Sequence, residues 1–192
     1  MLRRLYNWVL GWSQSPYATL ALFIFAFFES SFFPIPPDVL LMALALSAPK
    51  RALYYALICT IGSVSGGVFG YLIGYYFYEI LGVPIIEFYG LTKSFTLISE
   101  QYNANAFIVI AIASFTPIPY KVFTIAAGVF EVSLPTLIGA SLLGRAGRFF
   151  LVGGLIRVFG PTIKDFIDRY LNILTIAFIV LLVLGFTVVS YL

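Results

Sequence analysis

The sequence predicts an all-α integral membrane protein with two opposed re-entrant helical hairpins, about three full transmembrane helices and an N-terminal interfacial helix. Composition is the first reason, because the 192 residues are 61% hydrophobic and 10% charged, with a mean hydropathy of +1.03. The second reason is an inverted repeat: residues 31–46 return 83 positions later as residues 114–129, with seven of sixteen aligned positions identical. In each copy prolines interrupt an apolar stretch, and paired breaks of this kind mark a site at the membrane midplane.

Composition also excludes several kinds of protein. The chain has no histidine, and Cys59 is its one cysteine, which rules out a disulfide framework, a Cys/His zinc site and Cys–His catalysis. We expect Cys59 to be a small buried hydrophobic residue. The net charge of +3 is modest, so it indicates membrane orientation and not a nucleic-acid surface. We therefore expect residues 1–192 to form a single membrane domain without a metal, a cofactor or a nucleic-acid partner.

The chain begins with two short apolar segments. Residues 1–12 place Trp8 and Trp12 on the apolar face of a helix, which predicts an interfacial helix. No signal-peptide cleavage site follows the apolar run at 17–28, so we expect the N-terminus to be retained. That run makes about 18 Å of helix, whereas a full span needs ~20 residues. It therefore reaches roughly the middle of a membrane.

A proline cluster follows that run. Pro34, Pro36 and Pro37 prevent the helix from continuing, and the next apolar piece is again short. Residues 16–48 are therefore predicted to form a re-entrant hairpin. Its tip contains unpaired backbone groups, which survive at membrane depth only where protein or water surrounds them.

A long apolar helix at 52–81 completes a first repeat of residues 15–81. Glycine recurs in this helix at every fourth position, and small residues at this spacing let another helix approach closely. The glycines are Gly62, Gly66, Gly70 and Gly74. They predict tight helix packing.

The second half of the chain follows the same order. Residues 82–104 are polar and are expected outside the membrane. Pro117 and Pro119 break a second hairpin at residues 105–130. The remaining segments are a span at 134–158, which closes a second repeat of residues 105–160, and a final span at 171–192.

Charged residues outside the spans segregate in this layout. Basic residues gather on one side of the membrane: Arg3, Arg4, Lys50, Arg51, Arg157, Lys164 and Arg169. Acidic residues gather on the other side, together with Lys93: Glu79, Glu87, Glu100 and Glu131. The positive-inside rule then places the basic side and the N-terminus in the cytoplasm.

Five ionisable residues lie at membrane depth in this layout: Glu29, Asp38, Lys121, Arg145 and Arg148. An arginine, lysine or aspartate at the centre of a transmembrane helix costs ~2.5–3.5 kcal/mol or more, so each must meet a partner or water. Asp38 and Lys121 are equivalent in the repeat, and we expect them to approach each other where the hairpin tips meet. Arg145 and Arg148 project from a common helix face.

These charges predict an anion site. Arginine binds phosphate through two parallel hydrogen bonds and stays charged when buried. The helices that begin after the prolines also direct their positive N-terminal ends to the hairpin tips. The candidate phosphate ligands are Arg145, Arg148, Lys121 and Tyr120. Glu29 and Asp38 are the candidate proton-coupling residues.

Plainer interpretations stay open for the same residues. Glu29 and Lys121 could extend to the membrane interfaces, and Asp38 could cap the helix that it begins. Arg145 and Arg148 could serve only to neutralise the carboxylates. The glycine stripe could pack within one chain or between protomers, so a homo-oligomer is allowed.

Five motifs carry a resemblance when taken together: Glu29 with PIPPD at 34–38, the glycine-rich helix at 62–74, SFTPIPYK at 114–121, AAG at 126–128 and GRAGRFF at 144–150. In combination they resemble the DedA family, and within it the YqaA-like branch of the wider VTT or SNARE-associated Golgi superfamily. The resemblance covers roughly residues 15–160. It implies a membrane protein with two opposed re-entrant hairpins, in which Glu29 and Asp38 fall on the family's acidic positions.

The resemblance also implies a role in envelope maintenance, dependence on the proton gradient and movement of lipids between leaflets. The lipids are polyprenyl-phosphate carriers in bacterial members and phospholipids in eukaryotic ones. The second hairpin departs from the common form, because Ser114 stands where an arginine precedes Phe-x-Pro. Lys121 can replace the family's later arginine, and Arg145 or Arg148 can supply the missing charge.

We therefore expect a transporter, flippase or scramblase that moves an anionic lipid, a polyprenyl phosphate or a phospholipid, across a prokaryotic plasma (inner) membrane with proton coupling. Membrane lipids are then its partners. One alternative is a proton- or cation-coupled transporter of a small solute, and another is a structural scaffold. An enzyme is not expected, because the sequence offers no nucleophile–base pair and no metal cluster.

Overall fold

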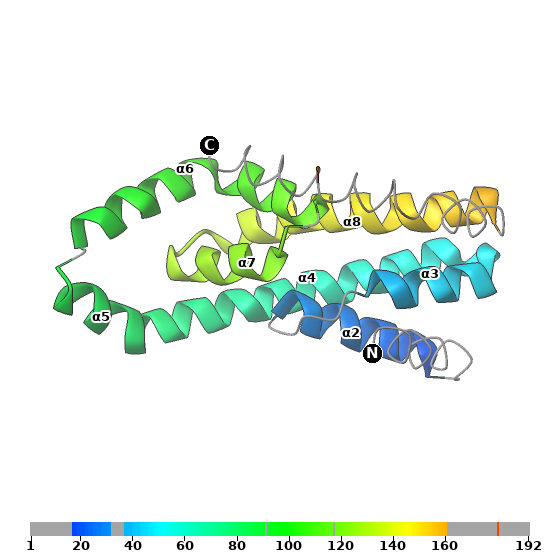
Figure 1. The fold of residues 1–192 in the computed structure, drawn as a ribbon, viewed down its shortest axis with the longest axis horizontal. Coiled ribbons are helices and arrows are strands. Elements are labelled where there is room, and N and C mark those ends of the chain that lie inside the picture. The colour runs from blue at the N-terminus through cyan, green and yellow to red at the C-terminus, as the bar shows by residue number, and fades with distance from the viewer. Residues whose placement is uncertain (1–16, 32–36, 91, 117, 161–179, 181–192) are drawn as a thin grey trace.

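The structure is a computed structural model that describes residues 17–31, 37–90, 92–116, 118–160 and Val180. Within these residues every regular element is a helix, which confirms the all-α class (Figure 1). The predicted interfacial helix at 1–12 lies outside the described residues. So does the predicted final span at 171–192, apart from Val180.

The helices follow one another through short connections. They are α2 (Ala18–Ser31), α3 (Asp38–Ser47), the 3₁₀ turn η1 (Pro49–Arg51), α4 (Ala52–Phe77), the π-helical turn η2 (Tyr78–Gly82), α5 (Val83–Phe88), α6 (Thr92–Phe115), α7 (Tyr120–Val129) and α8 (Leu134–Phe159). Pro37 directly precedes α3 and Pro119 directly precedes α7, because proline ends a helix but tolerates the start of the next one. The other predicted breaks, at Pro34, Pro36 and Pro117, lie outside the described residues.

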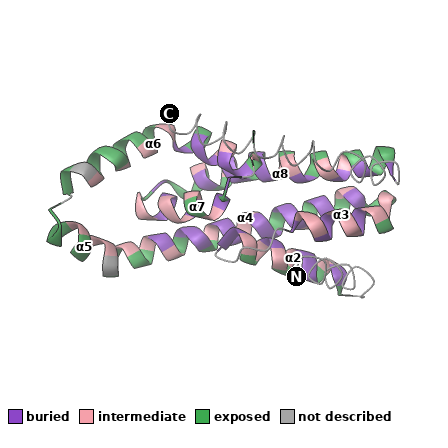
Figure 2. Cartoon of the chain, in the orientation of Figure 1, coloured by how far each residue is buried: buried purple, intermediate pink, exposed green. Residues whose placement is uncertain are grey.

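Two long antiparallel helices, α4 and α8, lie side by side along the molecule (Figure 1). Gly153 of α8 packs against Ala52 and Ala56 at the start of α4. Helices α2 and α7 pack on α4, α6 packs on α8, and α3 contacts both long helices. The buried residues lie where these helices meet, whereas α5 and the start of α6 are exposed (Figure 2).

The glycine stripe of α4 packs within the chain. A Cβ at Gly62 would stand 2.7 Å from the carbonyl oxygen of Phe23 in α2, and one at Gly66 would overlap the backbone of the same helix. Gly70 and Gly74 receive α7 in the same way. All four glycines are buried, so this stripe brings one helix of each pair against α4 and is not exposed to a second protomer.

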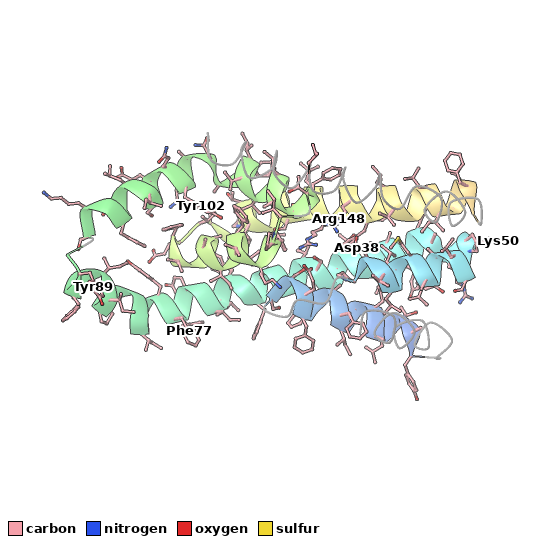
Figure 3. The ribbon with its side chains drawn as sticks, in the orientation of Figure 1. Asp38, Lys50, Phe77, Tyr89, Tyr102 and Arg148 are labelled. Carbon is pink, nitrogen blue, oxygen red and sulfur yellow. The ribbon has the colours of Figure 1, made fainter. Side chains whose placement is uncertain are left out.

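The helix pairs α2–α3 and α6–α7 approach the middle of the molecule from opposite ends (Figure 1). Ala18 at the start of α2 and Leu44 near the end of α3 belong to one apolar cluster with Tyr55, near the start of α4. Lys50 lies at that end of the molecule and Tyr89 at the other (Figure 3). This opposed arrangement agrees with the inverted repeat, while the re-entrant path of each pair through a membrane stays a prediction.

One stretch of the described residues is both long and apolar enough to cross a membrane. It runs from Pro49 to Ile80, which is 32 residues, and 18 consecutive residues within it have a mean hydropathy of 1.7. Helix α8 has 26 residues, which is long enough, but Arg145, Arg148 and its glycines make it less apolar. Of the three predicted full spans, length and composition therefore support the one at 52–81.

Helix α6 begins at Thr92, well before the predicted hairpin boundary at residue 105. The polar side chains just before this boundary are accommodated inside the helix. Asn103 donates from Nδ2 to the carbonyl of Ser99, one turn earlier, at 3.0 Å, and to the carbonyl of Phe130 at 2.8 Å. The second pair therefore has one long and one short helix, unlike the first.

The described charges gather at the two ends as predicted. Lys50 and Arg51 precede α4 and Arg157 lies in the last turn of α8, which is the same end because the two helices are antiparallel. Lys93 and the acidic residues lie in segments toward the other end, which are η2, α5, the first half of α6 and the turn after α7: Glu79, Glu87, Glu100 and Glu131. The assignment of the basic end to the cytoplasm stays a prediction.

Candidate functional site

Arg148 joins the two helix pairs at the middle of the molecule (Figure 3). Its Nε donates to Oδ1 of Asp38 at 3.1 Å and its Nη2 donates to Oδ2 at 2.9 Å. Its Nη1 donates to the backbone carbonyl of Thr116 at 3.1 Å. One guanidinium on α8 thus holds the start of α3 and the residue that follows α6, with a two-point contact to the carboxylate.

Arg145, one turn earlier on α8, is more deeply buried. Its Nη2 lies 3.4 Å from Oε2 of Glu29, with the two side chains 3% and 17% exposed. Its Nε has no hydrogen-bond partner among the described residues. The guanidinium carbon stands 4.1 Å from the ring centre of Tyr120 and 5.8 Å from that of Phe149. Aromatic faces therefore supply part of the surroundings that water would give an exposed arginine.

Tyr120 is the first residue of α7 and is fully buried. Its hydroxyl donates to Oγ of Ser141 at 2.5 Å. A Cβ at Gly67 of α4 would meet this hydroxyl, so a glycine there gives the tyrosine its space. The predicted phosphate ligand Tyr120 is thus in the site, but its hydroxyl is bonded to α8.

Small hydroxyl residues connect the helix pairs to the long helices, and one of them also contacts a carboxylate. The charge pattern of the sequence did not predict these contacts. Ser30 donates from Oγ to Oε2 of Glu29 at 3.1 Å and shares a buried 2.6 Å hydrogen bond with Oγ of Ser63. Ser31 donates to the carbonyl of Gly66 at 3.0 Å. Its repeat equivalent Ser114 likewise donates to a long helix, at the carbonyl of Ala140 on α8 at 3.4 Å. The identity of Ser31 and Ser114 at equivalent positions of the repeat was the sequence signal that could have predicted these contacts.

The structure gives five of the six predicted charged or aromatic site residues a partner within the set. Arg145 contacts Glu29 and Tyr120, and Arg148 contacts Asp38. Lys121 follows Tyr120 in the first turn of α7 and is partly buried. The ion pair that the structure gives Asp38 is with Arg148, so the approach of Asp38 to Lys121 stays a prediction. Asp38 uses both carboxylate oxygens in that ion pair, and Glu29 is turned to Arg145 rather than to an interface.

The arrangement suits exchange of anions. Two guanidinium groups each meet one carboxylate, and arginine accepts a phosphate in the same two-point geometry as a carboxylate. No group of three or more His, Cys, Asp or Glu side chains that could hold a metal ion occurs among the described residues. The site is therefore a cluster of two cations and two titratable anions at the point where both helix pairs are interrupted.

Opposed helix pairs, a long apolar helix and a buried charge cluster are together typical of a helical membrane protein with an internal ionic site. Comparison with known families agrees with this class, because the VTT domain matches residues 35–158, which is more than half of the chain. The chain therefore belongs to the DedA family, whose characteristic domain is the VTT domain. VTT domain proteins are membrane proteins, and the family is associated with membrane transport or lipid-related function.

Two curated relatives are similar over most of their length. A Haemophilus influenzae protein described as "Uncharacterized protein" is 31% identical over 186 residues, which cover 97% of this chain and 96% of the relative. A Histophilus somni protein, "Uncharacterized protein HI0703 homolog", is 32% identical over 148 residues, 77% of each chain. No solved structure matches the chain.

Proposed function

We propose that this protein moves an anionic, phosphate-bearing lipid, a polyprenyl phosphate or a phospholipid, between the leaflets of a prokaryotic plasma membrane, without chemical change to the lipid. The observation that carries the proposal is the pairing of Arg145 and Arg148 with Glu29 and Asp38 where both helix pairs are interrupted. Arginines at that depth need an anionic partner when no substrate is bound, and they can exchange it only for another anion. The phosphate of a lipid headgroup is such an anion.

Binding proceeds by exchange of one anion for another. Removal of one partner from a buried ion pair destabilises a protein by ~3–5 kcal/mol, so Arg148 does not remain without an anionic partner. The phosphate takes the place of the Asp38 carboxylate on Nε and Nη2, and the fork geometry of the guanidinium fits both anions. Arg145 receives the phosphate through Nη2 and the unpartnered Nε. Lys121, beside Tyr120 at the start of α7, adds positive charge to the same region.

Protonation of the carboxylates couples the site to a proton gradient. A neutral Glu29 or Asp38 no longer competes for its arginine, so proton uptake favours phosphate binding and phosphate release favours proton release. This reciprocity is a thermodynamic necessity, because a proton that raises the affinity for phosphate must itself bind more tightly when phosphate is bound. Ser30, which contacts both Glu29 and Ser63, accommodates either charge state because a hydroxyl can donate or accept.

Movement of the lipid follows from the position of Arg148. Its contacts with Asp38 and with the Thr116 carbonyl connect the first helix pair to the second. Exchange of the carboxylate for a phosphate opens this connection, and the two pairs can then rock against α4 and α8 about the site. Such motion of repeats about a fixed site is how transporters with inverted repeats alternate their access.

A coupled transporter of a small solute is the second candidate. The burial of the Glu29–Arg145 pair favours this second candidate. A site with so little exposure to solvent suits a small ion or solute as well as a lipid headgroup. Lipid movement requires a path that opens sideways to the bilayer, whereas solute movement does not. The two candidates therefore differ in substrate and share the charge cluster.

The test is leaflet exchange in liposomes that contain the purified protein. Fluorescent polyprenyl phosphate and fluorescent phosphatidylglycerol are followed by surface quenching, with and without a pH gradient. We expect exchange by the wild type, strong loss in Arg145→Ala and Arg148→Ala, and no loss in the matched control Arg157→Ala, which is exposed at the end of α8. Full exchange by both site variants would refute the proposed site.

The same liposomes separate the remaining outcomes. No exchange of any lipid by folded protein would favour the solute transporter. Exchange that ignores the pH gradient would indicate an equilibrating scramblase. Extraction of the lipid after the assay must recover it unchanged, because a dephosphorylated product would make the protein an enzyme.

A further inference from the structure

Arg145 has surroundings that a buried arginine rarely tolerates. The residue is 2% exposed, its one ion pair is a single 3.4 Å contact, and its Nε lacks an acceptor among the described residues. A guanidinium carries five N–H donors, and burial without partners normally favours rearrangement of the side chain. Something other than Glu29 must therefore keep it in this position.

The ring of Tyr120 lies against the Arg145 guanidinium. The centre-to-carbon distance of 4.1 Å is well inside the range of a cation–π contact, while Phe149 stands further away at 5.8 Å. A cation–π contact acts through the positive charge and does not require an N–H group of the guanidinium as a hydrogen-bond donor. The ring thus holds the cation without consuming a donor.

Tyr120 is itself held at both of its ends. Its backbone begins α7, directly after Pro119. Its hydroxyl donates to Ser141 of α8, one turn before Arg145, and lies against the Cα of Gly67 of α4. The ring is therefore fixed between the two long helices, and its position does not depend on Glu29.

We propose that Tyr120 is the positioning residue of the site: its ring, and not its hydroxyl, holds the Arg145 guanidinium where that group meets the phosphate. The inference rests on the proposed function. With Glu29 neutral or displaced, Arg145 stays in place on the ring and offers Nη2 and Nε to the ligand. This role differs from the ligand role that the sequence assigned to the Tyr120 hydroxyl, because that hydroxyl is bonded to Ser141.

The binding test uses farnesyl phosphate, a short polyprenyl phosphate, titrated into the protein in detergent micelles. Tyr120→Phe keeps the ring, so its Kd should stay within about threefold of the wild type. Tyr120→Leu removes the ring, so its Kd should rise about tenfold or more and approach that of Arg145→Ala. Tyr102→Leu is the control, because Tyr102 is a partly buried tyrosine whose hydroxyl donates to the Phe123 carbonyl of α7, and it has no cation–π contact among the described residues.

A spectroscopic readout is independent of function. The Nε–H proton of Arg145, identified by Arg145→Lys in ¹⁵N-arginine spectra, should show an upfield ring-current shift in the wild type and in Tyr120→Phe, and lose it in Tyr120→Leu. If Tyr120→Leu does not fold, Gly67→Ala replaces it, because the added Cβ meets the tyrosine hydroxyl and displaces an intact ring. Gly67→Ala should both weaken the binding of farnesyl phosphate and reduce the ring-current shift of the Arg145 Nε–H proton.

The outcomes separate the two proposals. Wild-type affinity in folded Tyr120→Leu, or in Gly67→Ala with a reduced shift, would overturn the positioning role. Equal weakening in Tyr120→Phe and Tyr120→Leu would overturn it too, because the hydroxyl and not the ring would then matter. Absence of any phosphate binding by the wild type, with the ring-current shift present, would refute the proposed function and leave Tyr120 as a structural support of Arg145 only.

Discussion

Arg148 and Asp38 stand 110 positions apart, and each oxygen of the carboxylate accepts one hydrogen bond from the guanidinium, at 3.1 and 2.9 Å. The third contact of this guanidinium is the Thr116 carbonyl, directly after α6. One side chain of a long helix therefore fixes both interrupted helix pairs relative to each other. The stability of this joint and the transport that we propose depend on the same two residues.

We expect Asp38→Asn to lower the free energy of unfolding by about 2–4 kcal/mol, because a partly buried guanidinium then loses its anion. The measurement is chemical unfolding in micelles, followed by circular dichroism. The double variant Asp38→Asn/Arg148→Gln should recover part of the loss, since it removes the uncompensated charge. Arg157→Gln serves as the control and should change little. Wild-type stability of the single variant would mean that the pair does not join the helix pairs.

Much of the chain path followed from local chemistry. The starts of α3 and α7 were predictable because proline restricts the backbone on its own, whatever surrounds it. The glycine stripe predicted close packing for the same reason. Its partners were not predictable, because the spacing of Gly62 and Gly74 says that a helix approaches α4 but not which one. Two short helices, α2 and α7, share the stripe between them.

The sequence predicted which residues form the charge cluster, but it did not predict which of them form ion pairs with each other. The cost of a charge at membrane depth identified Glu29, Arg145 and Arg148 from the sequence alone. The repeat suggested Lys121 as the partner of Asp38, but pairing depends on how far α8 is shifted along α4, and a repeat offset does not give that shift. Backbone acceptors such as the Thr116 carbonyl are invisible in a sequence because every residue has one.

The glycine stripe offers a sharp stability test. Gly66→Ala should destabilise the protein by about 1–3 kcal/mol, because the added Cβ would overlap the backbone of α2 at Phe27. Gly154→Ala is the matched control on α8, where nothing lies within 4 Å of the added Cβ. It should be neutral or stabilise by about 0.5–1 kcal/mol through helix propensity. Equal effects of the two substitutions would show that the packing of α2 on α4 is not as close as described.

Glu29→Gln should make lipid exchange faster at alkaline pH and less dependent on pH. In the wild type, the Glu29 carboxylate is paired with Arg145, so it competes with the phosphate. Glutamine keeps the shape without the charge, and we expect about three- to tenfold faster exchange at pH 8. Asp38 still competes for Arg148, so some pH dependence should persist. An unchanged pH profile would remove Glu29 from the coupling, and slower exchange at pH 8 would contradict the competition itself.

The opposed helix pairs predict which residues share a side of the membrane. Tyr17 precedes α2 and Lys50 follows α3, and both lie at the same end of the molecule because the two helices form one pair (Figure 1). If the pair is re-entrant, single cysteines at these two positions should react with an impermeant maleimide from the same side, and one at Glu87 from the other. All three positions are exposed.

The experiment uses a Cys59→Ser background, because Cys59 is fully buried and its replacement leaves no other thiol. Labelling is compared between right-side-out and inside-out membrane vesicles. Tyr17→Cys and Lys50→Cys should react in the inside-out vesicles, since the basic end is expected in the cytoplasm. Reaction of the two from opposite sides would mean that α2 and α3 together cross the membrane once. The break between them would then be a kink in a single span, and the charge cluster would lose its place between two re-entrant tips.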